Sequence, residues 1–251
     1  MTLLITLIVF LYGSIFTSFY TLVGMRVPKN ESIQGRSHCD QCDEKIPWYG
    51  LMPVFGWVFV KGKCLSCESK VSIKYPLYEL IGGGLFALGY LVLDGQWVEF
   101  VIYCLFISLM IIVTVSDIEY KIVPDSILLI FLPFLFIGRM IEPAMSIWNS
   151  ILGGVLGFLV MYAIAWYGKK RFKKDALGGG DIKLYFLIGL FLGAQIVFLS
   201  LFFASLLGLI LGKVVMNKER EVPFVPFIFF GVLMTYFLGI HILEWYMGLF
   251  F

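Results

Sequence analysis

Long apolar runs constrain this chain more than any other feature of its sequence. Of its 251 residues, 60% are hydrophobic and only 14% are charged. A soluble domain averages about 45–50% apolar and about 25% charged residues. Several runs are close to the roughly 20 residues that a helix needs to cross a bilayer. The sequence therefore predicts an all-α polytopic membrane protein in a lipid bilayer. Its net charge of +2 gives no bulk attraction to nucleic acid.

Eight apolar segments predict about eight transmembrane helices. The sixth is too short for a full crossing at about 1.5 Å of rise per residue. It forms one long run with the seventh, weakly broken at Gly193-Ala194-Gln195. Seven spans plus a re-entrant half-helix is therefore an open alternative. The eight segments are residues 3–23, 76–93, 98–116, 126–141, 149–167, 182–193, 196–214 and 224–248.

Basic residues are distributed asymmetrically about these segments. In the eight-span arrangement, 18 of the 19 Lys and Arg residues fall on one side, and Arg139 alone falls opposite. Positive loops favour the cytoplasm, so we predict that this side faces the cytosol and that both chain ends lie outside. The apolar start of the chain has no basic stretch and no small-residue cleavage site after it. We interpret it as a retained first span.

The predicted organisation has three parts: a first transmembrane helix over residues 1–23, a loop domain over 24–75 and a transmembrane core over 76–251. The loop domain contains two Cys-x-x-Cys pairs, Cys39 with Cys42 and Cys64 with Cys67. Four thiolates at this spacing are typical of a structural zinc site. Reducing conditions in the cytosol argue against disulfides, although free or redox-active cysteines are the alternative. Four sulfurs complete the zinc shell, so we interpret His38 as a surface residue and the metal as structural.

Two aspartates lie where apolar segments end on the predicted cytosolic side. Asp117 closes the run 101–116 at a helix C-terminus, where the helix dipole disfavours a negative charge. Asp181 follows the glycine triplet Gly178-Gly179-Gly180 and, taken alone, is typical of a helix N-cap. Three glycines allow close approach of the backbone. A phosphate-loop pattern is absent, because no Gly-Lys-Ser/Thr follows.

Further polar residues are candidates for supporting this site. Asp125 follows Pro124 at the start of a span, and helix capping is its expected role. Glu79 lies about one turn inside the second span, where an acid is costly without a partner. It either lines the site or pairs with a basic residue. Gly153-x-x-x-Gly157 indicates close helix packing.

The chain resembles the type IV prepilin peptidases, aspartic proteases of the Gly-x-Gly-Asp type, and in particular their competence-pilin branch from Gram-positive bacteria. In one departure, Thr17-Ser18-Phe19-Tyr20-Thr21 stands where many members have Gly-Ser-Phe-x-Asn. The resemblance extends nearly from end to end. It rests on Arg26-Val27-Pro28, Arg36-Ser37-His38-Cys39, Ile46-Pro47-Trp48-Tyr49, Gly62-Lys63-Cys64, Tyr75-Pro76 with Glu79, Asp117 with Pro124-Asp125, Gly178-Gly179-Gly180-Asp181-Ile182-Lys183 and Pro223-Phe224-Val225-Pro226.

The resemblance implies an endopeptidase of the bacterial cell (inner) membrane that removes the leader peptide of prepilin or pseudopilin precursors at the cytosolic face. It assigns Asp117 and Asp181 as the catalytic pair. We expect the glycine triplet, Glu79, Asp125 and Lys183 to support them. The resemblance also implies that many members methylate the new N-terminus with S-adenosylmethionine.

Other functions compatible with the sequence are a zinc-stabilised membrane scaffold or transporter, a methyltransferase alone, and a protease acting on other membrane signals. A transporter with functional acids predicts them near the bilayer midplane, whereas Asp117 and Asp181 lie at span ends. The sequence does not specify the particular pilin or the oligomeric state.

Overall fold

A computed structural model describes residues 1–39, 41–142, 145–173, 177–215 and 222–249. Over these residues the chain is helical, and its β-structure consists of two isolated bridges, His38 with Lys45 and Lys63 with Lys70. The all-α prediction is confirmed. Lys174, Lys218 and Arg220, which contribute to the predicted charge asymmetry, lie outside the described residues.

The chain divides into two compact units, Met1–Val115 and Ser116–Phe251. The first unit holds a loop between two long helices. Its elements are α1 (Thr2–Arg26), the 3₁₀ turns η1 (Val27–Lys29) and η2 (Trp48–Leu51), α2 (Phe55–Phe59), α3 (Lys74–Val92) and the larger part of α4 (Trp97–Tyr120).

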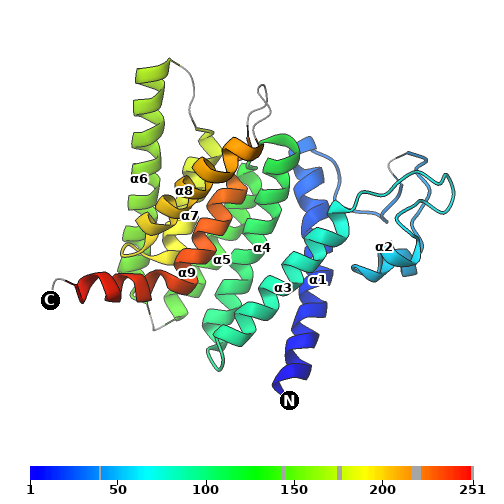
Figure 1. Cartoon of the computed structure of the whole chain (residues 1–251), viewed down its shortest axis with the longest axis horizontal. Helices are drawn as coiled ribbons and strands as arrows, with labels where there is room; N and C mark the ends of the chain where they lie inside the picture. Colours follow the sequence, from blue (N-terminus) through cyan, green and yellow to red (C-terminus); the bar gives the residue numbers. More distant parts are fainter. Residues whose placement is uncertain (40, 143–144, 174–176, 216–221, 250–251) are drawn as a thin grey trace. The chain divides into compact units, whose positions relative to one another are not determined.

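Small residues bring α1 and α3 together (Figure 1). Ser14 and Thr17 of α1 are buried and face Gly83 and Gly82 of α3, which leave room for the neighbouring backbone. Such contacts are typical of helices that pack in a membrane, where close backbone approach replaces the hydrophobic effect.

The second unit contains the end of α4 and five further helices. These are α5 (Asp125–Ile141), α6 (Ile147–Phe172), α7 (Gly179–Leu192), α8 (Val197–Val215) and α9 (Val225–Met247).

Helix α7 packs against α6 at backbone-to-backbone distance. A side chain on Gly189 of α7 would collide with the backbone of Gly153, and a side chain on Gly157 would collide with the Tyr185 carbonyl. The prediction of close packing at Gly153-x-x-x-Gly157 is confirmed.

The C-terminal end of α7 is held by polar groups of α5 and α6. Arg139 is buried, donates from Nη2 to the Phe191 carbonyl oxygen at 2.6 Å and lies over the Phe191 ring. Ser150 donates to the Leu190 carbonyl, and the Asn149 side chain accepts from the Ala194 amide at 3.1 Å. A cation at the last carbonyls also complements the helix dipole. α7 is therefore fixed at the end opposite Asp181.

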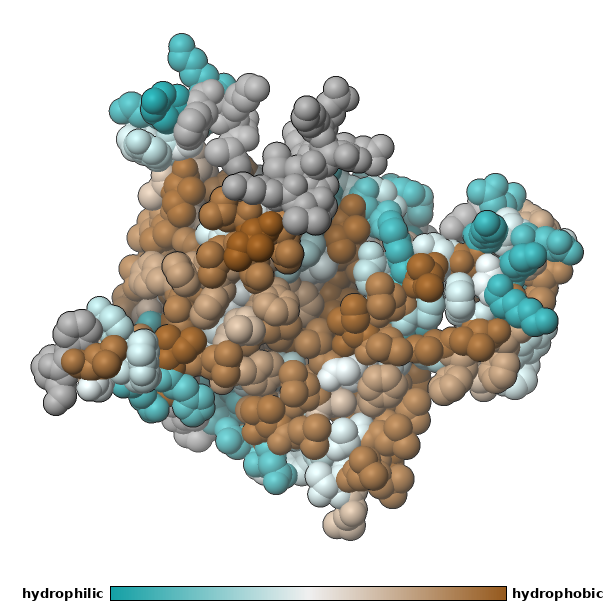
Figure 2. Space-filling model, viewed as in Figure 1, coloured by the Kyte–Doolittle hydropathy of each residue, from teal (hydrophilic) through white to brown (hydrophobic). Residues whose placement is uncertain are grey.

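All eight predicted apolar segments form helices, but a count of eight crossings is not confirmed. Within the described residues, five helices are long and apolar enough to cross a membrane: α1, α3, α4, α6 and α9. α5 has 17 residues and contains Pro133, and α7 has only 14 residues before Gly193, whose φ is +82°. α8 contributes a shorter apolar stretch, Val197–Leu211. On the face drawn in Figure 2, hydrophilic surface gathers over the α1–α3 loop and over the C-terminal end of α6.

Candidate active site

Asp117 lies in the last turn of α4 and is 6% exposed. Its Oδ2 atom accepts a hydrogen bond from the backbone N–H of Val225 at 2.9 Å, and Val225 is the first residue of α9. The first amides of a helix favour a negative charge. The N-terminus of α9 therefore offsets the unfavourable C-terminal end of α4. The sequence analysis did not predict that Val225 contacts Asp117, although Pro226 indicates that a helix begins there.

The chain turns sharply after Asp117. Lys121 directly follows α4 and has φ +56°, and its amide donates a hydrogen bond to the Asp117 carbonyl oxygen at 2.9 Å. The Ser116 hydroxyl donates to the Ile122 carbonyl oxygen. This turn leads into Val123, which contacts the start of α7.

Asp181 is the third residue of α7, because the N-cap position belongs to Gly178. Asp181 is therefore not the N-cap, which is the position that its local sequence taken alone favours. The Asp181 carboxylate instead turns back toward the Gly178 backbone, as acids at the third helical position commonly do. The side chain is 8% exposed.

Gly180 is the member of the triplet whose lack of a side chain matters most. A Cβ atom there would lie 2.6 Å from the Cβ of Val123 and 3.2 Å from the Val123 carbonyl oxygen. The same atom on Gly179 would meet nothing within 4 Å. Gly180 thus lets the first turn of α7, with Asp181, rest directly on the turn that follows Asp117.

The two buried carboxyl groups influence each other. Burial, and next to it the negative charge of Asp117, raises the pKa of Asp181 from 3.8 to about 6, against the opposing effect of the Gly178 backbone. Asp181 lies in the first turn of α7, which is not among the five candidate spans. A proton on Asp181 beside a charged Asp117 is the arrangement in which two carboxyl groups share one site at low electrostatic cost.

Asp125 and Lys183 form an ion pair next to this region. Lys183 Nζ lies 2.7 Å from Asp125 Oδ2, and both side chains are more than half exposed. Asp125 is the first residue of α5 and makes no capping hydrogen bond, so the predicted capping role is wrong. The preceding Pro124 takes the N-cap position, and the carboxylate reaches across to α7.

Glu79 belongs to the first unit, in α3. Its Oε2 atom accepts a hydrogen bond from the Val54 N–H at 2.7 Å, and its second partner is the Ser18 side chain. Both partners are neutral groups from unit 1. A basic partner for Glu79, one of the two predicted alternatives, is not present among the described residues.

The four predicted cysteines form one cluster, whose sulfur atoms all lie within 4.8 Å of one another. The two halves repeat the same local geometry. The Cys39 amide donates to the Glu44 carbonyl, and the Cys64 amide donates to the Ser69 carbonyl; Asp43 and Glu68, four residues after each first cysteine, both have φ +56°. Each Cys-x-x-Cys pair is therefore a short knuckle that turns both of its sulfurs inward.

The cluster fits a tetrahedral metal site. The Sγ atoms are 3.8 Å apart for Cys39 and Cys67 and for Cys42 and Cys64. Sulfurs bound to zinc at about 2.3 Å in a regular tetrahedron are about 3.8 Å apart. The Ser69 hydroxyl, followed by backbone hydrogen bonds, lowers the pKa of the Cys39 thiol to about 6. Against a backbone hydrogen bond at Glu44, the Cys67 sulfur raises the pKa of Cys42 to about 12. All four cysteines are free of disulfides.

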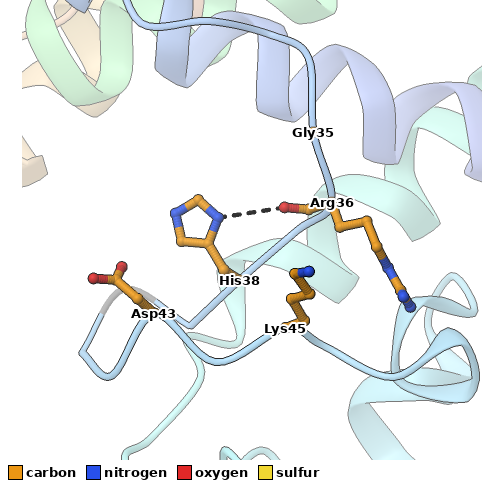
Figure 3. Close-up of a pocket in the computed structure, with 5 residues that line it drawn as sticks. All are labelled: Gly35, Arg36, His38, Asp43 and Lys45. Carbon is orange, nitrogen blue, oxygen red and sulfur yellow. Dashed lines mark hydrogen bonds between the residues drawn. The ribbon is translucent and has the colours of Figure 1, made fainter.

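His38 takes no part in the cluster. It lines a shallow pocket with Gly35, Arg36, Asp43 and Lys45, and its Nδ1 atom lies 3.3 Å from the Arg36 carbonyl oxygen (Figure 3). With four sulfurs already converging, a structural metal needs no further ligand from this ring.

Comparison with known families matches most of the chain. Residues 11–93 match the model of the bacterial peptidase A24 N-terminal domain. Residues 104–213, which contain both aspartates, match the model of the type IV leader peptidase family.

Three relatives are each named prepilin leader peptidase/N-methyltransferase. The Bacillus subtilis (strain 168) protein is 37% identical over 95% of this chain and 96% of its own length. The Klebsiella pneumoniae protein is 32% identical over 78% of this chain and 89% of its own, and the Stutzerimonas stutzeri protein is 29% identical over 76% and 68%. No solved structure matches this chain.

Proposed function

The chain belongs to the type IV leader peptidase family, and on this premise we propose that it is a membrane aspartic endopeptidase that removes leader peptides from prepilins or pseudopilins. The observation that carries the proposal is the pair Asp117 and Asp181, two buried acids from separate helices whose charges influence each other. Competence pseudopilins are the precursors that the sequence resemblance favours.

In the proposed reaction, one carboxyl group is ionised and the other is protonated. The ionised carboxylate removes a proton from a water molecule while the water oxygen bonds to the scissile carbonyl carbon. The protonated carboxyl donates a hydrogen bond to the carbonyl oxygen. Collapse of the tetrahedral intermediate breaks the C–N bond, and the leaving amine takes a proton from the pair. No covalent enzyme intermediate is required.

We assign the proton in the resting pair to Asp181. Its raised pKa and its burial favour the neutral form. Asp117 accepts the Val225 amide at the start of α9, and a donor at a helix N-terminus favours the charged carboxylate. Because the two groups titrate together, this assignment describes the predominant microstate of the pair.

The position of the acids at helix ends supports catalysis at a membrane face. Asp117 lies three residues before the end of α4, and Asp181 lies three residues after the N-cap of α7. A transporter that couples ions through these acids would favour positions near the bilayer midplane. The bias of basic residues supports a site on the cytosolic side of the cell membrane.

The cysteine cluster and the relatives' second activity are separate parts of the proposal. Cys39, Cys42, Cys64 and Cys67 would hold a structural zinc ion that stabilises the loop. The N-methyltransferase in the relatives' names favours S-adenosylmethionine as a methyl donor. Thr21, which stands where many members have Asn, is buried and donates within its own helix to the Thr17 carbonyl at 2.9 Å. Its hydroxyl is therefore already used inside α1.

Asparagine substitution tests the catalytic pair. Asp117→Asn or Asp181→Asn should reduce leader removal by about 10²–10⁴-fold, because each removes a group that transfers a proton. The assay follows the size of a prepilin in membranes that contain each variant. Glu244→Gln, at an exposed acid of α9, is the matched control and should process normally. Normal processing by either aspartate variant would refute the pair.

A further inference from the structure

Helix α2 exposes a face that is unusual for a water-facing loop. Phe55, Val58 and Phe59 have positions i, i+3 and i+4 and therefore share one side of the helix. Their exposed fractions are 58%, 58% and 65%, and Trp48 in the adjoining turn η2 is 69% exposed. The surface over α2 is hydrophobic and adjoins the hydrophilic surface of the rest of the loop (Figure 2). Contiguous apolar patches of this kind mark interaction sites.

The opposite side of α2 is used for packing inside the loop. Trp57 donates from Nε1 to the Val71 carbonyl oxygen at 3.0 Å, and Gly62 packs against its ring. Gly56 is buried against the backbone of Gly50. Because Trp57 and Gly56 already attach α2 to the loop, the exposed apolar face has no packing role in the loop.

Glu79 connects α2 to a helix long and apolar enough to span a membrane. Its carboxylate accepts the N–H of Val54, the residue that immediately precedes α2, at 2.7 Å. Glu79 is the sixth residue of the candidate span that begins at Lys74. Five steps of about 1.5 Å place it roughly 7–8 Å along the helix from Lys74. Interfacial helices bury their apolar face about 5–10 Å into the boundary between headgroups and acyl chains.

Val54 has an uncommon backbone conformation at this contact. Val54 has φ +61°, which is rare for a β-branched residue and persists only when its surroundings hold it. The hydrogen bond to Glu79 supplies such a restraint, and the Ser18 side chain of α1 is the other group that contacts the same carboxylate.

We propose that α2, together with the turn η2, is an interfacial anchor whose exposed apolar face lies in the headgroup region of the bilayer that α1 and α3 span. Glu79 holds it at that depth. Trp and Phe are side chains that suit this zone, and Lys61 and Lys63 directly after α2 are exposed and complement anionic headgroups. The anchor fixes the cysteine cluster against the membrane surface.

Photo-crosslinking in the full chain tests this anchor without depending on cleavage. The full chain with Phe59→p-benzoylphenylalanine is reconstituted in vesicles of phosphatidylethanolamine and phosphatidylglycerol and irradiated. The adducts are then identified by mass. Leu65→p-benzoylphenylalanine is the matched control, because Leu65 is 57% exposed but lies between Cys64 and Cys67 of the cysteine cluster. Phospholipid adducts at position 59, at least about fivefold above position 65, are the expected result. Adducts only to a second copy or to an added prepilin, or equal labelling at both positions, would overturn the anchor.

A second pair of variants tests the role of Glu79. Glu79→Gln keeps an oxygen that accepts the Val54 N–H and should preserve lipid labelling at position 59. Glu79→Ala removes the acceptor and should reduce that labelling several-fold, while protease protection of α1 and α3 stays unchanged. Lipid labelling that is unaffected by Glu79→Ala would show that Glu79 does not position α2.

Discussion

The cysteine cluster and the aspartate pair are built in opposite ways. The cluster assembles from two short knuckles that repeat the same turn, and each knuckle needs only its own six or so residues. The aspartate pair needs the end of α4, the start of α7 and the start of α9, which are far apart in the chain. The cysteine cluster depends on local turns, and the aspartate pair depends on close backbone packing. Small changes of helix packing should therefore damage the aspartate pair and spare the cysteine cluster.

Among the changes that test this difference between the cluster and the pair, the largest effect is expected at Gly180. Gly180→Ala should lower leader removal by about a hundredfold, since a shift of the order of 1 Å in a catalytic group can cost that much. The new methyl group would lie 2.6 Å from Val123 and displace Asp181. Gly179→Ala is the matched control and should change processing little, because its Cβ faces open space. Equal activity of the two variants would disprove the close-approach explanation.

The converse experiment removes the metal. Chelation, or Cys64→Ser, should release bound zinc and increase protease cleavage of the α1–α3 loop by at least about tenfold, because ligation supplies much of the stability of such small domains. The membrane helices should stay inserted. Cys104→Ser in α4 serves as control, since Cys104 lies outside the cluster, and should keep its zinc. Loss of zinc without any change in the digestion pattern would contradict a structural role.

A smaller effect is expected from pH. The pKa of Asp181 in the folded chain, about 6, lies above its ordinary value of 3.8, so the folded state binds this proton more tightly. The stabilisation from Asp181 is therefore present below about pH 4 and is lost as pH rises to about 6. Thermal unfolding in detergent should show a fall in Tm of a few degrees across this range. Asp181→Asn should flatten that part of the profile, and an unchanged profile would argue against the raised pKa.

The smallest effect concerns the ion pair of Asp125 and Lys183. Both side chains are more than half exposed, and exposed pairs contribute about 0.2–1 kcal/mol. A double-mutant cycle with Asp125→Asn and Lys183→Met, read out as unfolding free energy, should give a coupling within that range. A coupling of several kcal/mol would mean that the pair is part of the structural core of the site.

Local patterns in the sequence were sufficient for some predictions. Each of the eight apolar segments forms a helix, and the break at Gly193 ends α7 with a positive φ. The Cys-x-x-Cys pairs form the cluster, because a knuckle is determined by neighbouring residues. Asp125 follows the N-cap Pro124 by one position and Asp181 follows the N-cap Gly178 by three, so neither is the N-cap that its local sequence favours.

The amino-acid sequence alone determined the helical class, the four-sulfur cluster and the family, because hydropathy, short ligand spacing and motifs are properties of adjacent residues. Tertiary structure decided what surrounds Asp117 and Asp181. The amide of Val225 that binds Asp117, the approach of Gly180 to Val123 and the contact of Glu79 with Val54 all join residues distant in the chain. Hydrogen bonds and burial between such residues exist only once the helices have packed, so the sequence alone does not give the environment of either carboxyl group.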